Sequence, residues 1–509
     1  SGGSDTGKSP FPNTKIVLDH DKGRCLETTV DLRLGQIVFV EDAFLYSSYQ
    51  DGTKSDRETF LFKAYGKTVY NQLDDIYEEL SCLPKFDCLD TARNFIQLVA
   101  FMHMKNDLLT STGKNSAYNL LGPLANDLAR KYELLEQLKP GNDESLAACI
   151  ADVKAFTDAY PKALPRSVSL KQAGAALGLL NTNQVELEDF GGSGLFVGMA
   201  ILEHSCEYNC SYTTKGSRLY LACTKDIPAG SRMSIDYGNF FYTPTGERQR
   251  ILQESYGFTC ECSLCTNFDR KRAYACPECA KQGRAGVVCL LPDGRSGSPC
   301  LVCSKSPSAS HIAKCLQREL SLLDDPPETF DAALLAGDEG LLHESHHLLF
   351  AVTDIVAKDV AEEAKRRAMF LESGEGATVD LTHQQKGMAD LFTPALTIMQ
   401  HCCKLLDMVL PLVSPEKVIY HDRLGQLAVC AGNQEVARQA FGSAYQMSCW
   451  ANGKDSPTSK QLLLLAEHTP ETRAELMKHY AVGDGGGVDD HPMDGGGVDD
   501  HPMDGGGVD

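Results

Sequence analysis

Two short segments that carry cysteines decide how this sequence is interpreted: EHSCEYNC at positions 203–210 and YGFTCECSLC at positions 256–265. The second segment supplies the thiolates of Cys260, Cys262 and Cys265. A closed structural zinc site takes four ligands, so the fourth must come from another part of the chain. Cys206 and Cys210 are the candidates. A zinc ion held in this way fixes the 258–266 loop against the first segment and forms one wall of a pocket.

A second cysteine pattern follows along the chain. Cys276-x2-Cys279 and Cys300-x2-Cys303 flank a spacer of 20 residues. Four thiolates at this spacing are typical of a structural zinc ribbon, here over residues 274–304. Because sulfur fills all four positions, this zinc ion stabilises the fold and leaves no position for a catalytic water. Cys289 stays outside the set.

The composition excludes several classes of protein. The 509 residues contain 20 Cys, and their clustering indicates metal ligation in a reducing compartment rather than a disulfide scaffold. The formal charge of −21 argues against electrostatic binding of nucleic acid, which requires clustered Lys and Arg. The longest apolar run, residues 195–202, is too short to cross a membrane.

Apolar periodicity predicts a β-rich domain over residues 14–245. The runs with strand character are 15–18, 36–40, 194–202, 219–223 and 233–237. Between about residues 56 and 160 the apolar residues take helical spacing, most clearly at 91–109. The pattern therefore predicts a helical insertion inside the β-rich domain.

The C-terminal part of the chain has helical character. Asn433 is the expected N-cap of an amphipathic helix, and Thr469-Pro470-Glu471 is expected to open another. Such helix pairs favour a superhelical stack of the tetratricopeptide type over residues 310–480, although the sequence shows no diagnostic repeat there. Residues 485–509 repeat an acidic GGGVDDHPMD unit, so they are expected to be a disordered tail. The Gly/Ser/Pro-rich residues 1–13 are also expected to be disordered.

Several motifs occur in a fixed order: GRCL at 23–26, EHSCEYNC, AGSRMSIDYG at 229–238 and YGFTCECSLC. In this order and spacing they resemble the opening turn, the signature, the core end and the post-SET zinc motif of SET-domain lysine methyltransferases. Tyr420-His421 and Gly453-Lys-Asp-Ser-Pro457 resemble the C-terminal domain of the SET-and-MYND kind. The resemblance covers roughly residues 14–45 and 170–480.

The resemblance implies an α+β fold. Its expected parts are a SET domain over 14–245 with the helical insertion, a post-SET zinc motif over 246–267, the zinc ribbon over 274–304 and an all-α tetratricopeptide-like domain over 310–480. The MYND zinc finger is not recognisable, because only Cys82 and Cys88 occur between Phe44 and Thr91. Recruitment of partners through a MYND module is therefore not expected.

The same resemblance implies transfer of methyl groups from S-adenosylmethionine to lysine side chains of proteins, histone or non-histone. Positioning and desolvation of a neutral amine carry much of such catalysis. The implied catalytic residues are Tyr237 and Tyr256. The implied cofactor contacts are Gly23, Arg24, Asn181, Glu203, His204 and Phe258, with Asn183 as the alternative to Asn181. The resemblance also makes Cys206 the fourth ligand of the post-SET zinc.

Three positions depart from the family pattern. Glu203 stands for the signature Asn, Tyr208 for the signature Pro, and Cys25 for the second Gly of the opening turn. An ionised Glu only accepts hydrogen bonds, and it repels the cofactor's carboxylate. Cys25 adds a side chain where backbone is expected to approach the ligand. These changes leave a second hypothesis open, a catalytically impaired SET-fold scaffold that binds protein partners through its helical domain.

The leading prediction is a monomeric protein-lysine methyltransferase of the cytoplasm or nucleus. It is expected to use S-adenosylmethionine and to hold two structural zinc ions. Its expected partner is a protein with an exposed lysine, histones included, and neither nucleic acid nor a membrane is expected to bind.

Overall fold

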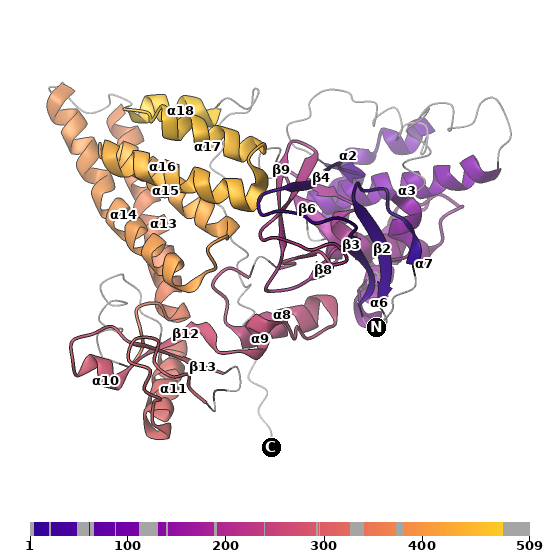
Figure 1. Ribbon diagram of the computed structural model, residues 1–509. Helices are drawn as coiled ribbons and strands as arrows, with labels where there is room; N and C mark the ends of the chain where they lie inside the picture. The colour runs from indigo at the N-terminus through magenta and orange to yellow at the C-terminus, as the bar shows by residue number, and fades with distance from the viewer. Residues whose placement is uncertain are drawn as a thin grey trace, which may run out of the picture.

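The computed structural model describes residues 5–19, 22–47, 61, 66–86, 88–110, 131–138, 141–187, 191–238, 240–291, 294, 296–325, 341–372 and 381–481. Figure 1 shows a β-rich part with its own helices, a helical C-terminal part beside it, and a small cysteine-bearing unit below the latter. Within the described ranges, every helix is too short or too polar to span a bilayer. The predicted α+β fold class is confirmed.

The β-rich part consists of several small sheets. The first sheet contains β1 (Asp5–Lys8), β2 (Thr14–Asp19) and β3 (Gly23–Thr28). The second contains β4 (Ile37–Asp42), β10 (Arg218–Cys223) and β9 (Cys210–Lys215), and the third β5 (Leu45–Tyr46), β7 (Ser193–Leu195) and β6 (Gln184–Glu186). β8 (Glu203–His204) runs parallel to β11 (Ser234–Ile235). Segments far apart in sequence therefore meet in each of the last three sheets.

The structure contains strands at four of the five predicted runs, and the prediction for the fifth run is largely wrong. The runs at 15–18, 36–40 and 219–223 fall in β2, β4 and β10, and the run at 233–237 shortens to β11. The run at 194–202 is instead the end of β7 followed by a 3-10 turn, η1 (Met199–Ile201). The backbone N–H groups of Val197 and Gly198 donate to the carboxylate of Glu41, each at 2.9 Å. A side chain thus replaces the neighbouring strand as the partner of this backbone.

The expectation of disorder over residues 1–13 is wrong for residues 5–13. Residues 5–8 pair with β2, and the ring of Phe11 is buried and stacks on Phe39 at a centroid distance of 4.6 Å. Composition alone missed this because one strand edge and one aromatic anchor suffice to order the segment. Residues 1–4 and the acidic repeat at 485–509 lie outside the described residues.

Helices from the predicted insertion pack against the strands. They are α2 (Leu73–Ser81), α3 (Leu89–Thr110) and α6 (Asp143–Ala159), followed by α7 (Leu170–Asn183). The helix expected at 91–109 is confirmed as α3. Asn142 caps α6, and Ser169 and Gln172 form a capping box on α7. These helices and the strands share one continuous hydrophobic core.

The linking region contains α8 (Thr245–Tyr256), α9 (Ser263–Thr266), β12 (Asp269–Ala275), α10 (Pro277–Ala280) and β13 (Val287–Leu290). The helical part contains α11 (Ala309–Asp324), α13 (His347–Glu372), α14 (Leu381–Val409), α15 (Pro415–Cys430), α16 (Gln434–Ser448), η2 (Cys449–Gly453), α17 (Pro457–Glu467) and α18 (Arg473–Ala481). Asn433 caps α16 as predicted. Thr469 does not open α18, because its hydroxyl donates to the Leu465 carbonyl at the end of α17.

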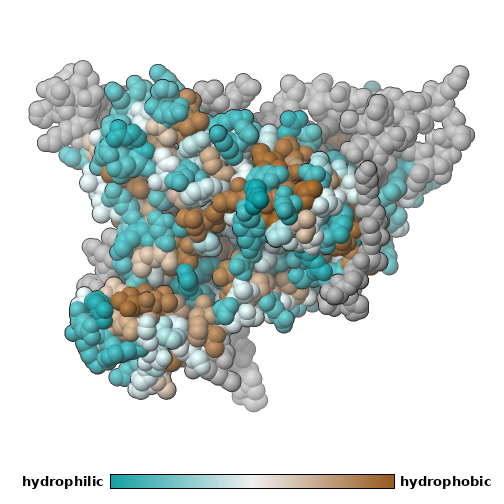
Figure 2. Space-filling model, in the orientation of Figure 1, coloured by the Kyte–Doolittle hydropathy of each residue, from teal (hydrophilic) through white to brown (hydrophobic). Residues whose placement is uncertain are grey.

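The helical part contacts the β-rich part through η2, which lies against β9 and β10. The Ser211 hydroxyl donates to the Ala451 carbonyl, and a side chain on Gly35 would place its Cβ 2.4 Å from the Cys449 carbonyl oxygen. Close backbone approach therefore holds the two parts together. Figure 2 shows that hydrophobic residues on this face form separate patches divided by hydrophilic ones.

Candidate functional site

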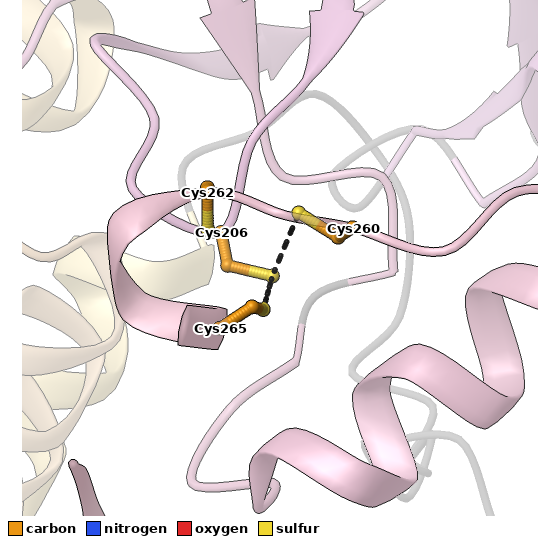
Figure 3. Close-up of side chains that lie close together, drawn as sticks. All are labelled: Cys206, Cys260, Cys262 and Cys265. Carbon is orange, nitrogen blue, oxygen red and sulfur yellow. Dashed lines mark hydrogen bonds between the residues drawn. The ribbon is translucent and has the colours of Figure 1, made fainter. Parts of the chain in front are cut away.

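Four cysteines from two distant segments gather beside β8. Cys206, Cys260, Cys262 and Cys265 point toward one another in Figure 3. The Cys206 sulfur lies 3.9 Å from that of Cys260 and 3.5 Å from that of Cys265. A tetrahedral zinc with Zn–S bonds of about 2.3 Å separates its sulfurs by about 3.8 Å. The spacing therefore fits a zinc ion that closes the loop between α8 and α9 onto the 203–210 segment.

The choice between Cys206 and Cys210 is resolved by the β9–β10 ladder. Cys210 lies opposite Cys223 in this antiparallel pair and is fully buried there. The Cys210 sulfur is thereby kept in the sheet, whereas Cys206 precedes the strand and reaches Cys260 and Cys265. All 20 cysteines are free thiols in this structure.

The second set, Cys276, Cys279, Cys300 and Cys303, gathers at the β12–β13 hairpin. Sulfur–sulfur distances are 3.6 Å from Cys276 to Cys303 and 3.7 Å from Cys279 to Cys300, again close to a zinc tetrahedron's edge. A Cβ on Gly286 would lie 2.5 Å from the Cys279 sulfur, so only glycine fits at this point. Both sets can hold zinc.

An aromatic cluster lies against the first cysteine set. The rings of Tyr237 and Tyr256 are 5.0 Å apart, and Phe258 lies 6.4 Å from each. The Tyr237 hydroxyl donates to the Leu202 carbonyl at 2.5 Å, and the Tyr256 hydroxyl donates to the Tyr237 carbonyl at 3.3 Å. Burial raises the pKa of both phenols. Both are therefore protonated donors at neutral pH and not bases.

His204 joins the aromatic cluster to the cysteines. Its Nδ1 accepts the backbone N–H of Tyr237 at 3.1 Å, and its Nε2 lies 3.3 Å from the Cys206 sulfur. Because Nδ1 accepts, the proton is assigned to Nε2, which then donates to the sulfur. Hydrogen bonds from outside the ligand set commonly orient metal ligands in this way.

These groups border a cavity of about 1000 Å³. Of the predicted site residues, those that line it are Gly23, Arg24, Glu203, His204, Tyr237, Tyr256, Phe258, Cys260 and Cys262. Gln137, Leu138 and Gly141 border it from the part of the chain predicted as the helical insertion. The Arg24 guanidinium donates to the Leu134 carbonyl and so links the opening turn to this segment.

One predicted cofactor contact is misplaced. The Asn181 side chain donates to the Lys85 carbonyl at 2.8 Å, and Asn181 does not line the cavity. Its neighbours Thr182 and Asn183 do. The alternative Asn183 is therefore the one that the structure brings to the site. The sequence could not separate them, because the choice depends on how the end of α7 is rotated.

The Cys25 departure does not obstruct the cavity. Its side chain is fully buried in β3, whereas Gly23 and Arg24 of the same turn line the cavity. Burial and the nearby Glu203 charge raise the pKa of the Cys25 thiol to about 12, so the thiol stays protonated. The expected clash with a ligand is therefore absent from this cavity wall.

Two basic residues at the cavity were missed by sequence reasoning. The Glu203 carboxylate lies 3.3 Å from the Lys22 ammonium and 3.5 Å from the Arg232 guanidinium. Arg232 also pairs with Asp19 at 2.6 Å. Lys22 directly precedes the GRCL motif, and Arg232 lies within the motif at 229–238. The unexpected acid Glu203 was the signal that could have prompted a search of these motifs for a basic partner. The Glu203 charge is thus balanced within the protein.

Part of this chain is similar to proteins of known family. The family model described as SET domain matches residues 23–238. Histone-lysine N-methyltransferase SMYD3 of Mus musculus is 37% identical over 79 residues, which cover 16% of this chain and 18% of that protein. N-lysine methyltransferase SMYD2 of Sus scrofa is 34% identical over 129 residues, covering 24% of this chain and 29% of that protein. The matched segments thus span less than a third of each of these relatives.

Two solved structures were also found to be similar. The SET domain of LSMT bound to lysine and AdoHcy aligns over 93% of this chain and 95% of that chain, with a TM-score of 0.28 and 11% identity. Rubisco LSMT bound to AdoMet aligns over 82% and 89%, with a TM-score of 0.29 and 11% identity. Such low scores carry no weight for the site. Residues 23–238 of this chain thus match the SET domain model, and shorter segments of the chain are similar to SMYD3 and SMYD2.

Proposed function

We propose that this protein transfers methyl groups from S-adenosylmethionine to lysine side chains of other proteins. One observation carries the proposal: the same cavity is lined by two protonated tyrosine side chains and by a set of ion-paired charged side chains. The phenols are Tyr237 and Tyr256, and the charges are those of Lys22, Glu203 and Arg232. The cavity is about 1000 Å³, enough for a cofactor and a lysine side chain together.

The charged end of the cavity suits the amino-acid end of S-adenosylmethionine, which carries an ammonium and a carboxylate. Glu203 Oε2 is buried, and its contacts with Lys22 and Arg232 at 3.3 and 3.5 Å are ion pairs without an aligned hydrogen bond, so it can still accept from the ammonium. Lys22 and Arg232 can face the carboxylate. His204 and Asn183 lie on the same cavity, and Phe258 offers an aromatic face for the adenine.

When bound, the cofactor supplies a methyl group activated by its sulfonium. The residues of this chain bind and orient the two reactants and exclude water. Tyr237 and Tyr256 surround the position of the amine with aromatic faces, which lowers the local polarity and favours the neutral amine. The Leu202 carbonyl fixes the Tyr237 hydroxyl, so the phenol is held in place before a substrate arrives.

The experiment is calorimetric titration of the full chain with S-adenosylmethionine, followed by a methyl-transfer assay on lysine-containing proteins. Saturable binding is expected. Glu203→Gln is expected to weaken binding about 10-fold or more, because the ammonium then meets a neutral amide in place of a charged carboxylate. Glu254→Gln, which alters an exposed pair with Arg250, is the matched control and is expected to bind normally. Absence of binding at millimolar cofactor contradicts the proposal.

A second candidate function is a SET-fold scaffold that binds proteins through its helical domain without catalysis. The observation that favours it is the ion-pair set, because Lys22 and Arg232 already neutralise Glu203 before any ligand arrives. Titration separates the two: binding of cofactor without methyl transfer to any lysine-containing protein, or no binding at all, supports the scaffold.

We further propose that each cysteine set holds one structural zinc, and that the protein is an intracellular monomer that acts on protein substrates rather than on nucleic acid or membranes. The reduced thiols and the charge of −21 support this. Light scattering tests the monomer. Cys206→Ser and Cys279→Ser are each expected to lose one zinc ion by mass spectrometry of the native protein. An unchanged zinc content in either variant contradicts that site.

A further inference from the structure

A third group of metal-ligating side chains lies outside the cavity and outside both cysteine sets. Glu319 lies in α11, His347 is the first residue of α13, and His346 directly precedes it. Figure 1 shows α11 beside the β12–β13 hairpin. The Nε2 atoms of His346 and His347 each lie 3.3 Å from the same Glu319 oxygen, Oε1. The His346 side chain is fully buried, that of Glu319 is 7% exposed and that of His347 is 15% exposed.

We propose that Glu319, His346 and His347 bind a third zinc ion. Zinc bonds to imidazole nitrogen and carboxylate oxygen are about 2.0–2.1 Å long, so two ligands of a zinc tetrahedron lie about 3.3–3.4 Å apart. The two measured nitrogen–oxygen separations equal this edge. Two His and one Glu form a common zinc donor set, in which a water takes the fourth position. That water would reach solvent past His347, because the His347 side chain is the most exposed of the three.

The His346 imidazole gives independent support. Its Nε2 is buried and has no hydrogen-bond partner among the described residues, although it lies near Glu319. His347 Nε2, at the same distance, does form a hydrogen bond with Oε1, so His346 alone carries this argument. A lone pair of His346 that is not aimed at Glu319 is free to bind an ion placed between the two side chains. A buried imidazole nitrogen without a partner is costly, and a metal ion would satisfy it.

Arg272 and Tyr274 of β12 hold the Glu319 carboxylate from its other side. Arg272 Nε donates to Oε1 at 2.9 Å, and the Tyr274 hydroxyl donates to Oε2 at 2.8 Å. Each carboxylate oxygen has two lone pairs, and Oε1 uses them for Arg272 Nε and for the His347 hydrogen bond. A metal ion bound by both Oε1 and His347 Nε2 would replace the second of these bonds. Partners such as Arg272 and Tyr274 orient ligating carboxylates. They are positioning residues here.

The Arg272 charge also sets the strength of the site. It offsets the Glu319 charge, so the ion gains less attraction here than among four thiolates. This zinc is therefore expected to leave before the zinc of either cysteine set when a chelator is added. It would join α11 and the start of α13 to the hairpin that carries the cysteine ribbon.

The test is the zinc content of the full chain after saturation with Zn²⁺ and removal of excess, measured by mass spectrometry under native conditions. His347→Phe and Glu319→Gln are each expected to hold one zinc ion fewer than the unmodified chain. Glu344→Gln alters a nearby carboxylate that pairs with Lys404, and it is expected to keep the full content. Equal contents in the unmodified chain and His347→Phe overturn the proposal.

A second measurement decides the case in which the variants do not fold. The unmodified chain is titrated with a mild chelator, and zinc release is followed together with cysteine accessibility. Release of one zinc ion before any cysteine becomes reactive supports the site. Release only together with cysteine exposure, or a content of two ions or fewer, overturns it and leaves a metal-free hydrogen-bonded cluster around Glu319.

Discussion

At the scale of single residues, His204 uses both ring nitrogens to connect two parts of the site. Nδ1 accepts from the Tyr237 backbone, and Nε2 faces the Cys206 sulfur. The orientation of Tyr237 is thus linked through one imidazole to Cys206 and its cysteine set. Asn can replace the Nδ1 acceptor and Gln can replace the Nε2 donor, so the two connections can be separated by substitution.

We predict that His204→Asn shifts the thiolate-to-metal absorption band of the cobalt-substituted protein, because the hydrogen bond to the Cys206 sulfur is lost. His204→Gln is expected to leave the band in place. Loss of such a partner commonly lowers metal affinity by about 10–100-fold. A shift in His204→Gln with none in His204→Asn would contradict the assignment of the two nitrogens.

Tyr237→Phe is expected to lower methyl transfer on the order of 100-fold while the protein stays folded, because the phenol loses its bond to the Leu202 carbonyl and its place beside the amine. Tyr242→Phe is the matched control. It removes a hydroxyl that donates to the Ser345 carbonyl at 3.0 Å, and neither residue lines the cavity. Steady-state turnover with circular dichroism checks both. Equal turnover in Tyr237→Phe and the unmodified chain removes Tyr237 from the mechanism.

Most of the predicted catalytic and cofactor-binding residues do line the cavity, because motif order and cysteine spacing depend on chemistry that few residues perform. The exceptions depend on three-dimensional arrangement. Asn181 and Asn183 differ only in the rotation of α7, and Arg232 becomes relevant only when the Glu203 strand and the Arg232 segment lie side by side. No local pattern encodes such a pairing across sheets.

At the scale of elements, Glu41 of β4 holds η1 by accepting two backbone N–H groups. Burial raises the pKa of Glu41 to about 7, against about 4.3 in an unfolded chain. The folded state therefore keeps a proton that the unfolded state releases between these values. Stability from this group is present below about pH 4.3 and is lost as the pH rises toward 7.

We predict that the free energy of unfolding falls with rising pH between 4.5 and 7.5 more steeply in the unmodified chain than in Glu41→Gln. The difference is expected to be on the order of 2 kcal/mol. Urea unfolding at several pH values, followed by circular dichroism, measures it. Parallel pH profiles for the two proteins would show that Glu41 does not titrate in this range.

The sequence predicted the elements that are determined by the periodicity of apolar side chains. It missed those that depend on a single tertiary contact. The helices at 91–109 and after Asn433 follow periodic apolar faces. The misassigned run at 194–202 is continuously apolar, and its backbone finds a carboxylate in place of a strand. The ordered segment at 5–11 depends on one aromatic anchor, Phe11, in a polar stretch.

At the scale of the whole molecule, the contact between η2 and the β9–β10 pair determines how the helical part is placed. Gly35 has φ +75° and no room for a Cβ beside the Cys449 carbonyl. Gly216 has φ +55° but nothing within 4 Å of the position of a Cβ. An alanine at either position would therefore strain the backbone, but only at Gly35 would its Cβ also clash with a neighbouring segment.

We predict that Gly35→Ala separates the two parts, whereas Gly216→Ala only lowers stability by about 1 kcal/mol. The single tryptophan, Trp450, lies in η2 and reports the contact. Its fluorescence is expected to shift to longer wavelength under native conditions in Gly35→Ala alone. Identical spectra in both variants would show that the junction tolerates the added methyl group.

The pairing of β4 with β10 has a consequence for synthesis of the chain. Phe39 lies opposite Leu221, so about 180 residues must be made before β4 finds its partner. At 5–20 residues per second the delay is roughly 10–40 s. During this interval β4 presents apolar side chains and an open hydrogen-bonding edge on the ribosome. High contact order of this kind makes the nascent protein a client for chaperones, and slower translation of the intervening insertion would prolong its exposure to aggregation.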